Sequence, residues 1–170
     1  MRACVRACVL IISAWIAPRT RKVARPNNET ADIGVLEAGG FADVAAHDKF
    51  CAAGDCVIKL IYDQSPQGNH LGQRITCVPG QGCVTHKMVN ASKHRIRVRG
   101  GGAVYGMWFD PGHGYHVDYT SGVAKGNDPE SIYAVMSGTH FNGRCCFDCA
   151  PSQDLNYWAA LRVMVPIRVR

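Results

Sequence analysis

The sequence lacks an apolar run long enough to cross a membrane as a helix, and it contains no internal repeat. Its longest apolar run, Ala7–Ala17, has eleven residues, whereas a membrane-spanning helix needs about 20. A membrane is therefore not expected as a partner. Only 19% of the 170 residues are charged while 47% are apolar, a balance that excludes a disordered chain and is typical of one globular domain.

Acidic residues are absent from the first 25 positions, so much of the excess positive charge lies there; the net charge of the whole chain is +6. Residues 1–25 carry +6, residues 26–149 carry −2, and residues 150–170 carry +2. A nucleic-acid-binding face needs basic side chains distributed over the folded body, so no nucleic-acid partner is expected. The pattern divides the chain into a signal peptide or unrelated extension at 1–25, a folded unit at 26–149 and a divergent tail at 150–170.

The sequence also has none of the common catalytic or metal-binding signatures. Its seven histidines form neither H-E-x-x-H nor H-x-H, and it contains no G-x-S-x-G and no second C-x-x-C to complete a four-ligand zinc site. Gly100–Gly102 follows a basic strand but opens no helix, which argues against a phosphate-binding loop. We therefore expect neither a metal nor a cofactor.

Cysteine, by contrast, is abundant: nine residues in 170, a density typical of secreted proteins. Two pairs, Cys51 with Cys56 and Cys77 with Cys83, bracket short polar loops that a disulfide can close. Because the count is odd, at least one thiol is free, intermolecular or removed by processing. The cysteines favour an extracellular, disulfide-bonded domain.

The N-terminus also favours secretion. A short basic start, Met1–Arg6, precedes the apolar run Ala7–Ala17, whose length suits the core of a signal peptide. Pro18 leaves the cleavage site poor, so a buried strand and a misjudged chain start stay open as alternatives. If the chain is exported, Asn28 and Asn90 each lie in a sequon that accepts a glycan.

Short segments of strand character alternate with clusters of turn-forming residues rich in glycine. Many short strands with frequent turns predict a mainly β domain, either a sandwich or a barrel. One short helix is expected at Phe41–Phe50, with Val44, Ala45 and Ala46 facing inward. The expected strands are Val57–Tyr62, His94–Arg99, Val104–Phe109, Ile132–Met136 and Leu161–Val169.

The most unusual local feature is Cys145-Cys146 followed by Cys149. Zinc ligation, a C-x-x-C redox motif and a disulfide between the two neighbours compete as interpretations, and two buried reduced thiols are the plainest one. Adjacent Cα atoms lie about 3.8 Å apart, below the usual disulfide range of about 4.4–6.8 Å. A bond between neighbours would therefore be strained, and it would form a rigid, polarizable wall suited to a ligand pocket.

Aspartates are the candidate catalytic groups if the protein hydrolyses glycosides. That chemistry uses two carboxylates, about 5–5.5 Å apart for retention of configuration or about 6.5–9.5 Å for inversion. The aspartates in strand and turn segments are better explained as turn and helix-capping residues than as catalysts. They are Asp43, Asp48, Asp63, Asp110, Asp118 and Asp148.

Several stretches between about residues 30 and 148 form one pattern when they are read in order. The most specific are the segment Ile61–Leu71 and the tetrad Cys145–Asp148. The other stretches are Asp32–Gly34, Gly39–Asp43, Asp48–Cys51 with Cys56, Tyr105-Gly106, Pro111–Tyr115, Ile132–Val135 and Gly138–Asn142. In order and spacing they resemble the catalytic domain of the α-L-arabinofuranosidase B family, glycoside hydrolase family 54.

The resemblance implies a fold and an activity. The fold would be a jelly-roll-like, concanavalin-like β-sandwich, here incomplete, and the protein would be a secreted, monomeric, retaining enzyme. Such enzymes release terminal α-L-arabinofuranose from arabinan and arabinoxylan, so the implied partner is an arabinose-containing plant cell-wall polysaccharide.

The resemblance also implies two disulfides. One joins Cys51 to Cys56, and the other joins Cys145 to Cys146 and lines the sugar pocket, with the Phe and Asp of the tetrad nearby. No family cysteines correspond to Cys77 and Cys83, whose pairing is expected from spacing alone.

The sequence departs from the family after the tetrad. The family's nucleophilic glutamate and acid/base aspartate lie beyond it, but no residue after Asp148 matches either of them, and no glutamate follows. No catalytic residue is therefore assigned. We expect the N-terminal part of a catalytic domain, inactive by itself, with altered or truncated sequence at both ends. A non-catalytic carbohydrate-binding module and a cysteine-rich structural or metal-binding secreted protein stay open as alternatives.

Overall fold

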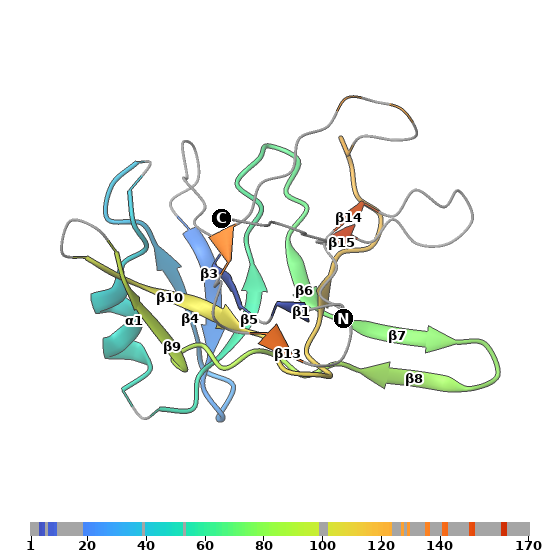
Figure 1. Ribbon diagram of the computed structural model, residues 1–170, viewed down its shortest axis with the longest axis horizontal. Helices are drawn as coiled ribbons and strands as arrows, with labels where there is room; N and C mark the ends of the chain where they lie inside the picture. Colours follow the sequence, from blue (N-terminus) through green and yellow to red (C-terminus); the bar gives the residue numbers. More distant parts are fainter. Residues whose placement is uncertain are drawn as a thin grey trace.

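The computed structural model describes residues 4–5, 7–9, 19–38, 40–52, 54–98, 102–123, 127, 129, 135–136, 141–142, 150–151 and 161–162. For the short strands before residue 19 and after residue 130 it describes the backbone alone. Antiparallel strands dominate this part of the chain, accompanied by a short helix (Figure 1). The prediction of a mainly β domain is confirmed.

A five-stranded antiparallel sheet, in the order β11-β6-β5-β3-β4, carries much of the described fold. In the interior strand β3, Val23 lies opposite Ala31 of β4 on one side and opposite Ile58 of β5 on the other. Valine and isoleucine suit the pleated interior of a sheet, and Val23 and Ile58 are fully buried. The five strands are β3 (Arg19–Ala24), β4 (Thr30–Gly34), β5 (Val57–Ile61), β6 (Leu71–Gln73) and β11 (Tyr115–His116).

Strand β3 lies inside residues 1–25, the segment that the charge pattern separated from the folded unit. The structure places it between β4 and β5, where it pairs with both. Removing a strand that is paired on both edges would expose two ladders of backbone N–H and C=O groups. Arg19–Ala24 therefore take part in the five-stranded sheet.

A second antiparallel sheet has the order β12-β2-β10-β9. The expected strands at Val57–Tyr62, His94–Arg99 and Val104–Phe109 appear as β5, β9 and β10. Strand β2 lies at the start of the apolar run near the N-terminus, and the signal peptide stays a prediction. The four strands are β2 (Ala7–Val9), β9 (His94–Arg97), β10 (Ala103–Trp108) and β12 (Val135–Met136).

The two sheets share one apolar core. Met107 of β10 packs in the same buried cluster as Val23 of β3, Ile33 of β4 and Ile58 of β5. Burial of such side chains is the main favourable contribution to folding. The remaining buried members of the cluster are Cys51, Cys56, Ile61, Val89 and Ala91.

The single helix of the described residues is α1 (Val44–Phe50), which lies beside β4 and β10 (Figure 1). Its inward face differs from the expected one. Ala45 and Ala46 are exposed and Val44 is half-buried, whereas His47 is fully buried. The alanines have little apolar area to gain by burial, while the imidazole of His47 fills the space next to the sheet with both ring nitrogens in polar contact.

A two-stranded hairpin, β7 (Ile75–Val78) with β8 (Gly82–Thr85), projects from the body of the molecule (Figure 1). The remaining short strands pair as β1 with β13 and as β14 with β15. These pairings do not establish a jelly roll, which stays a prediction. The four strands are β1 (Cys4–Val5), β13 (Phe141–Asn142), β14 (Ala150–Pro151) and β15 (Leu161–Arg162).

Candidate functional site

The predicted wall of the sugar pocket, Cys145-Cys146 with Phe147 and Asp148, lies outside the described residues. Its disulfide and its contact with sugar therefore stay predictions. The structure does describe the scaffold that precedes this segment in the chain, and three of its features bear on function: the two disulfides, a buried polar cluster under α1, and a pair of surface loops.

Two disulfides join the cysteine pairs that the spacing singled out. Cys51 directly follows α1 and bonds to Cys56, just before β5, with their Cα atoms 5.6 Å apart and both side chains almost fully buried. Cys77 and Cys83 face each other in the β7–β8 hairpin, with Cα atoms 4.0 Å apart, and both are exposed. The first disulfide links the helix to the core, whereas the second closes a surface hairpin.

Two of the candidate carboxylates fix local backbone. Asp43 caps the N-terminus of α1, since its Oδ1 accepts a hydrogen bond from the backbone N–H of Ala46 at 2.9 Å. The carboxylate of Asp63 accepts from the backbone N–H groups of Ser65 and Asn69, each at 2.8 Å. Burial tends to raise the pKa of Asp63, but these hydrogen bonds outweigh it and lower the pKa. Both residues have the turn and capping roles expected of them.

Two further candidates join neighbouring segments of the fold. Asp48 on α1 accepts a 2.7 Å hydrogen bond from the Tyr105 hydroxyl of β10. Asp110 forms a 3.1 Å ion pair with the Nζ of Lys93. Each carboxylate therefore has a structural partner of its own, which supports the structural interpretation of these aspartates over the catalytic one.

A buried polar cluster lies between α1, β3 and β10. The imidazole of His47 stacks on the ring of Tyr105, with ring centroids 4.2 Å apart and planes 21° from parallel. Its Nδ1 lies 3.3 Å from an Nη of Arg21, and its Nε2 lies 3.2 Å from the hydroxyl of Ser92. Arg21 also donates to the backbone carbonyl of Tyr105 at 3.0 Å.

Burial lowers the pKa of both basic side chains in this cluster. It lowers the pKa of His47 to about 4, helped by the nearby charge of Arg21 and opposed by Asp48, so the imidazole is neutral at pH 7. Burial also lowers the pKa of Arg21, to about 10, which leaves the guanidinium charged. Because solvent does not reach His47, we interpret the cluster as a positioning device for α1. Cys51, four residues later on the same helix face, was the signal that could have marked His47 as inward.

Hydrogen bonds between a side chain and the backbone join two surface loops, residues 63–70 and residues 116–123. Asn69 donates from Nδ2 to the carbonyl of Ser121 at 2.8 Å and accepts the Ser121 N–H at 3.0 Å. The Ser121 hydroxyl donates to Oε1 of Gln67 at 3.2 Å. In the same loop, Nε2 of His116 lies 3.1 Å from the carboxylate of Asp118, another aspartate with a local partner.

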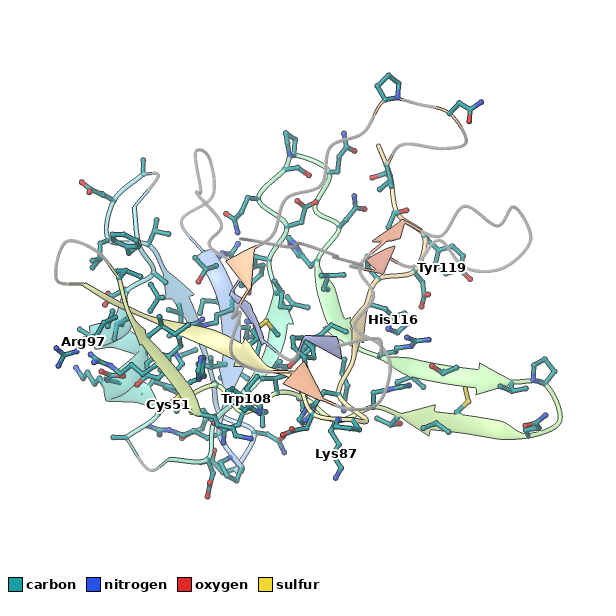
Figure 2. All side chains as sticks on the ribbon, viewed as in Figure 1. Cys51, Lys87, Arg97, Trp108, His116 and Tyr119 are labelled. Atoms are coloured by element: carbon teal, nitrogen blue, oxygen red, sulfur yellow. A yellow bond between two sulfur atoms is a disulfide. The ribbon has the colours of Figure 1, made fainter. Side chains whose placement is uncertain are left out.

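Tyr119 stands out of this loop. Its side chain is 90% exposed, and its backbone has φ of 59°, in the left-handed region that bulky residues rarely adopt. Figure 2 shows it at the end of the molecule opposite Arg97, on the same side as His116. The sequence analysis missed Tyr119, because no periodicity or motif marks a single tyrosine in a polar loop.

The two sequons differ in their surroundings. Asn28 is exposed in the turn between β3 and β4. Asn90 is half-buried, and its Oδ1 accepts the backbone N–H of Ser92 at 2.9 Å. The Ser92 hydroxyl contacts His47, and Ala91 between them is fully buried.

No metal centre emerges from the part of the chain that the structure describes: nowhere in it do three or more His, Cys, Asp or Glu side chains gather as a metal ion would require. The same part contains no helix long and apolar enough to span a bilayer.

Comparisons with known proteins agree with the resemblance seen in the sequence. Residues 6–157 match the family model for the catalytic domain of α-L-arabinofuranosidase B. A probable α-L-arabinofuranosidase B of Aspergillus terreus is 40% identical over 143 residues, which cover 81% of this chain and 28% of the relative. The α-L-arabinofuranosidase B of Aspergillus oryzae is 42% identical over 135 residues, covering 76% and 26%. The chain thus spans little more than a quarter of these relatives.

Solved structures give the same result. A glycoside hydrolase family 54 α-L-arabinofuranosidase variant soaked with 4-nitrophenyl α-L-arabinofuranoside superimposes with a TM-score of 0.57 at 31% identity, over 71% of this chain and 26% of the other. An arabinofuranosidase in complex with arabinofuranosyl-α-1,2-xylobiose gives 0.57 at 30% identity, over 72% and 25%. The chain therefore belongs to the α-L-arabinofuranosidase B catalytic family, glycoside hydrolase family 54.

Proposed function

We propose that the chain forms part of the catalytic domain of an enzyme that releases terminal α-L-arabinofuranose from arabinan and arabinoxylan. The observation that carries this proposal is the family match over residues 6–157, nearly the whole chain. The ligands of the related solved structures, an aryl arabinofuranoside and an arabinofuranosyl xylobiose, support a substrate of this class.

In this proposal the chain supplies one wall of the sugar pocket. Cys145 and Cys146 form a disulfide between neighbours, and Phe147 and Asp148 flank it. A strained bond of this kind is rigid and polarizable, and it presents a flat apolar surface to a furanose ring. The buried disulfide next to α1 and the His47 cluster fix the helix against the sheets of the same domain.

Bond cleavage with retention needs a nucleophilic carboxylate and a second carboxylic acid about 5–5.5 Å from it. No residue of this sequence matches either role in the family, and the described aspartates are held by structural partners. We therefore propose that this chain binds arabinofuranose but leaves hydrolysis to carboxylates it does not contain.

The test is titration of the purified, oxidised full chain with L-arabinose and with 4-nitrophenyl α-L-arabinofuranoside, followed at 400 nm for released nitrophenolate. We expect saturable binding of both ligands, no release of nitrophenolate, and loss of binding in Cys145→Ser. Mass mapping before and after reduction should show the disulfide between residues 145 and 146. Bound zinc with two free thiols at these positions would overturn the proposed pocket, and turnover by homogeneous protein would overturn the assignment of catalysis to other residues.

We further propose that the protein is a secreted, extracellular monomer. Its two disulfides favour an oxidising compartment. Of the two sequons, we propose Asn28 as the glycan site in the folded protein, because its side chain is exposed in a turn, whereas the Asn90 sequon packs against the core through Ala91 and Ser92. Peptide mapping of secreted protein with and without an endoglycosidase tests this choice.

A further inference from the structure

Among the described residues, the aromatic residue with a left-handed backbone, Tyr119, is also highly exposed. Tyr119 has φ of 59° and is 90% exposed. The left-handed region is costly for a residue with a bulky side chain, and a ring that is 90% exposed gains little burial to offset that cost. Strain retained without a packing benefit points to a role for the ring at the surface.

Hydrogen bonds hold the loop on both sides of Tyr119. On one side of Tyr119, Asp118 is bonded to His116 of β11 at 3.1 Å. On the other side, Ser121 exchanges two backbone hydrogen bonds with the Asn69 side chain, at 2.8 and 3.0 Å. Gly122 has φ of 65°, and a Cβ there would approach the Gln67 side chain to 2.6 Å, which shows how closely the two loops are packed.

The polar groups around this loop suit a neutral, hydroxyl-rich ligand. The Ser121 hydroxyl donates a hydrogen bond to Oε1 of Gln67 at 3.2 Å. The Nε2 of the same amide takes no part in that bond. Amides and hydroxyls both donate to and accept from sugar hydroxyls. Neither the 63–70 loop nor the 116–123 loop contains lysine or arginine, so an anionic ligand is not favoured.

We propose that Tyr119 is an aromatic platform for a neutral pentose polysaccharide chain, a binding subsite made of other residues than the terminal-arabinose pocket proposed at residues 145–148. The ring face would stack on the C–H face of a sugar unit, and the fixed loop would lower the entropy cost of ordering the tyrosine on binding. This inference rests on the proposed function for the class of ligand, but on different residues.

The experiment is isothermal titration of the full chain with soluble arabinoxylan and, separately, with L-arabinose. Tyr119→Ala should weaken arabinoxylan binding by about tenfold, while Tyr119→Trp should retain it. Leu36→Ala, which truncates an apolar side chain that is 69% exposed on a different loop, is the matched control and should leave binding unchanged. Binding of L-arabinose should be the same in all four proteins.

Tyr119→Gly separates binding from stability. Glycine adopts positive φ without strain, so this variant should lose arabinoxylan affinity as Tyr119→Ala does, but with a Tm equal to or above that of the unaltered protein. A lower Tm in Tyr119→Gly would mean that the ring is structural and would overturn the proposal. So would undiminished arabinoxylan binding by Tyr119→Ala, or no saturable arabinoxylan binding by the unaltered chain. If the unaltered chain bound arabinoxylan but not L-arabinose, the proposed pocket would be overturned and the Tyr119 subsite would not.

Discussion

The buried imidazole of His47 should make the protein lose stability as the pH falls below neutral. Its pKa in the folded protein is about 4, compared with 6.5 for an unperturbed histidine. The unfolded chain therefore binds a proton at a pH where the folded chain does not, and protonation favours unfolding. The stability that neutral His47 provides is present above about pH 6.5 and is lost as the pH falls towards 4.

The size of the effect follows from the two pKa values. One pKa unit corresponds to about 1.36 kcal/mol, so the full shift corresponds to about 3 kcal/mol of unfolding free energy. Between pH 7 and pH 5 the expected loss is about 2 kcal/mol. The charged or titratable groups around the imidazole are Arg21 of β3, Tyr105 of β10 and Asp48 on the helix itself, and Arg21 adds to the penalty on a second positive charge.

The assay is urea denaturation at pH 7, 6 and 5 of the unaltered protein and of His47→Gln. We expect His47→Gln to be less stable at every pH, because it loses the stacking contact with Tyr105. Between pH 7 and pH 5, however, its unfolding free energy should fall by about 2 kcal/mol less than that of the unaltered protein. Ser92→Ala is the matched control: it removes a hydrogen bond worth about 1 kcal/mol without removing a titratable group. Ser92→Ala should keep the pH dependence of the unaltered protein. An identical pH dependence in His47→Gln would refute the reasoning.

Three other changes test the scaffold by chemical denaturation. Replacing both Cys51 and Cys56 by alanine should cost about 2 kcal/mol, because the unfolded chain regains the freedom of the short closed loop. Asp43→Ala should cost about 1 kcal/mol through loss of the helix N-cap, and Asp43→Asn should restore most of it. Gly122→Ala should cost at least about 1–2 kcal/mol, because alanine is strained at φ of 65° and its Cβ would lie 2.6 Å from the Gln67 side chain. An unchanged midpoint in any of these variants would contradict the corresponding role.

The features that follow from local pattern were predicted well. Strand β5 was predicted because Val57–Ile61 is apolar and β-branched and Asp63 begins a turn immediately after Tyr62. The two short-range cysteine pairs were predicted because their separations of 5 and 6 residues restrict each pair to a small loop. In both cases the information lies within a few residues of the feature that it determines.

Features that depend on contacts distant in sequence were missed. His47 is inward because Arg21, Tyr105 and Ser92 approach it from three other segments. Tyr119 is notable because of its backbone angle and because Asn69 fixes the nearby Ser121, 52 residues away in the sequence. No short window of the sequence contains those partners. Cys51, four residues later, is the one local signal for His47, and Tyr119 has none.

The charge distribution also depends on contacts between strands that a count along the sequence does not reveal. Counted along the chain, the basic residues near the N-terminus have no acidic neighbours and mark a separate segment. In the fold, β3 pairs with β4, and this cross-strand pairing brings Arg19 and Lys22 within 3.2 and 3.1 Å of Asp32. Arg25, just after β3, pairs with Glu29 at 2.7 Å. Exposed pairs of this kind contribute little stability, but they reduce the local charge, so a charge boundary in the sequence need not be a domain boundary in the structure.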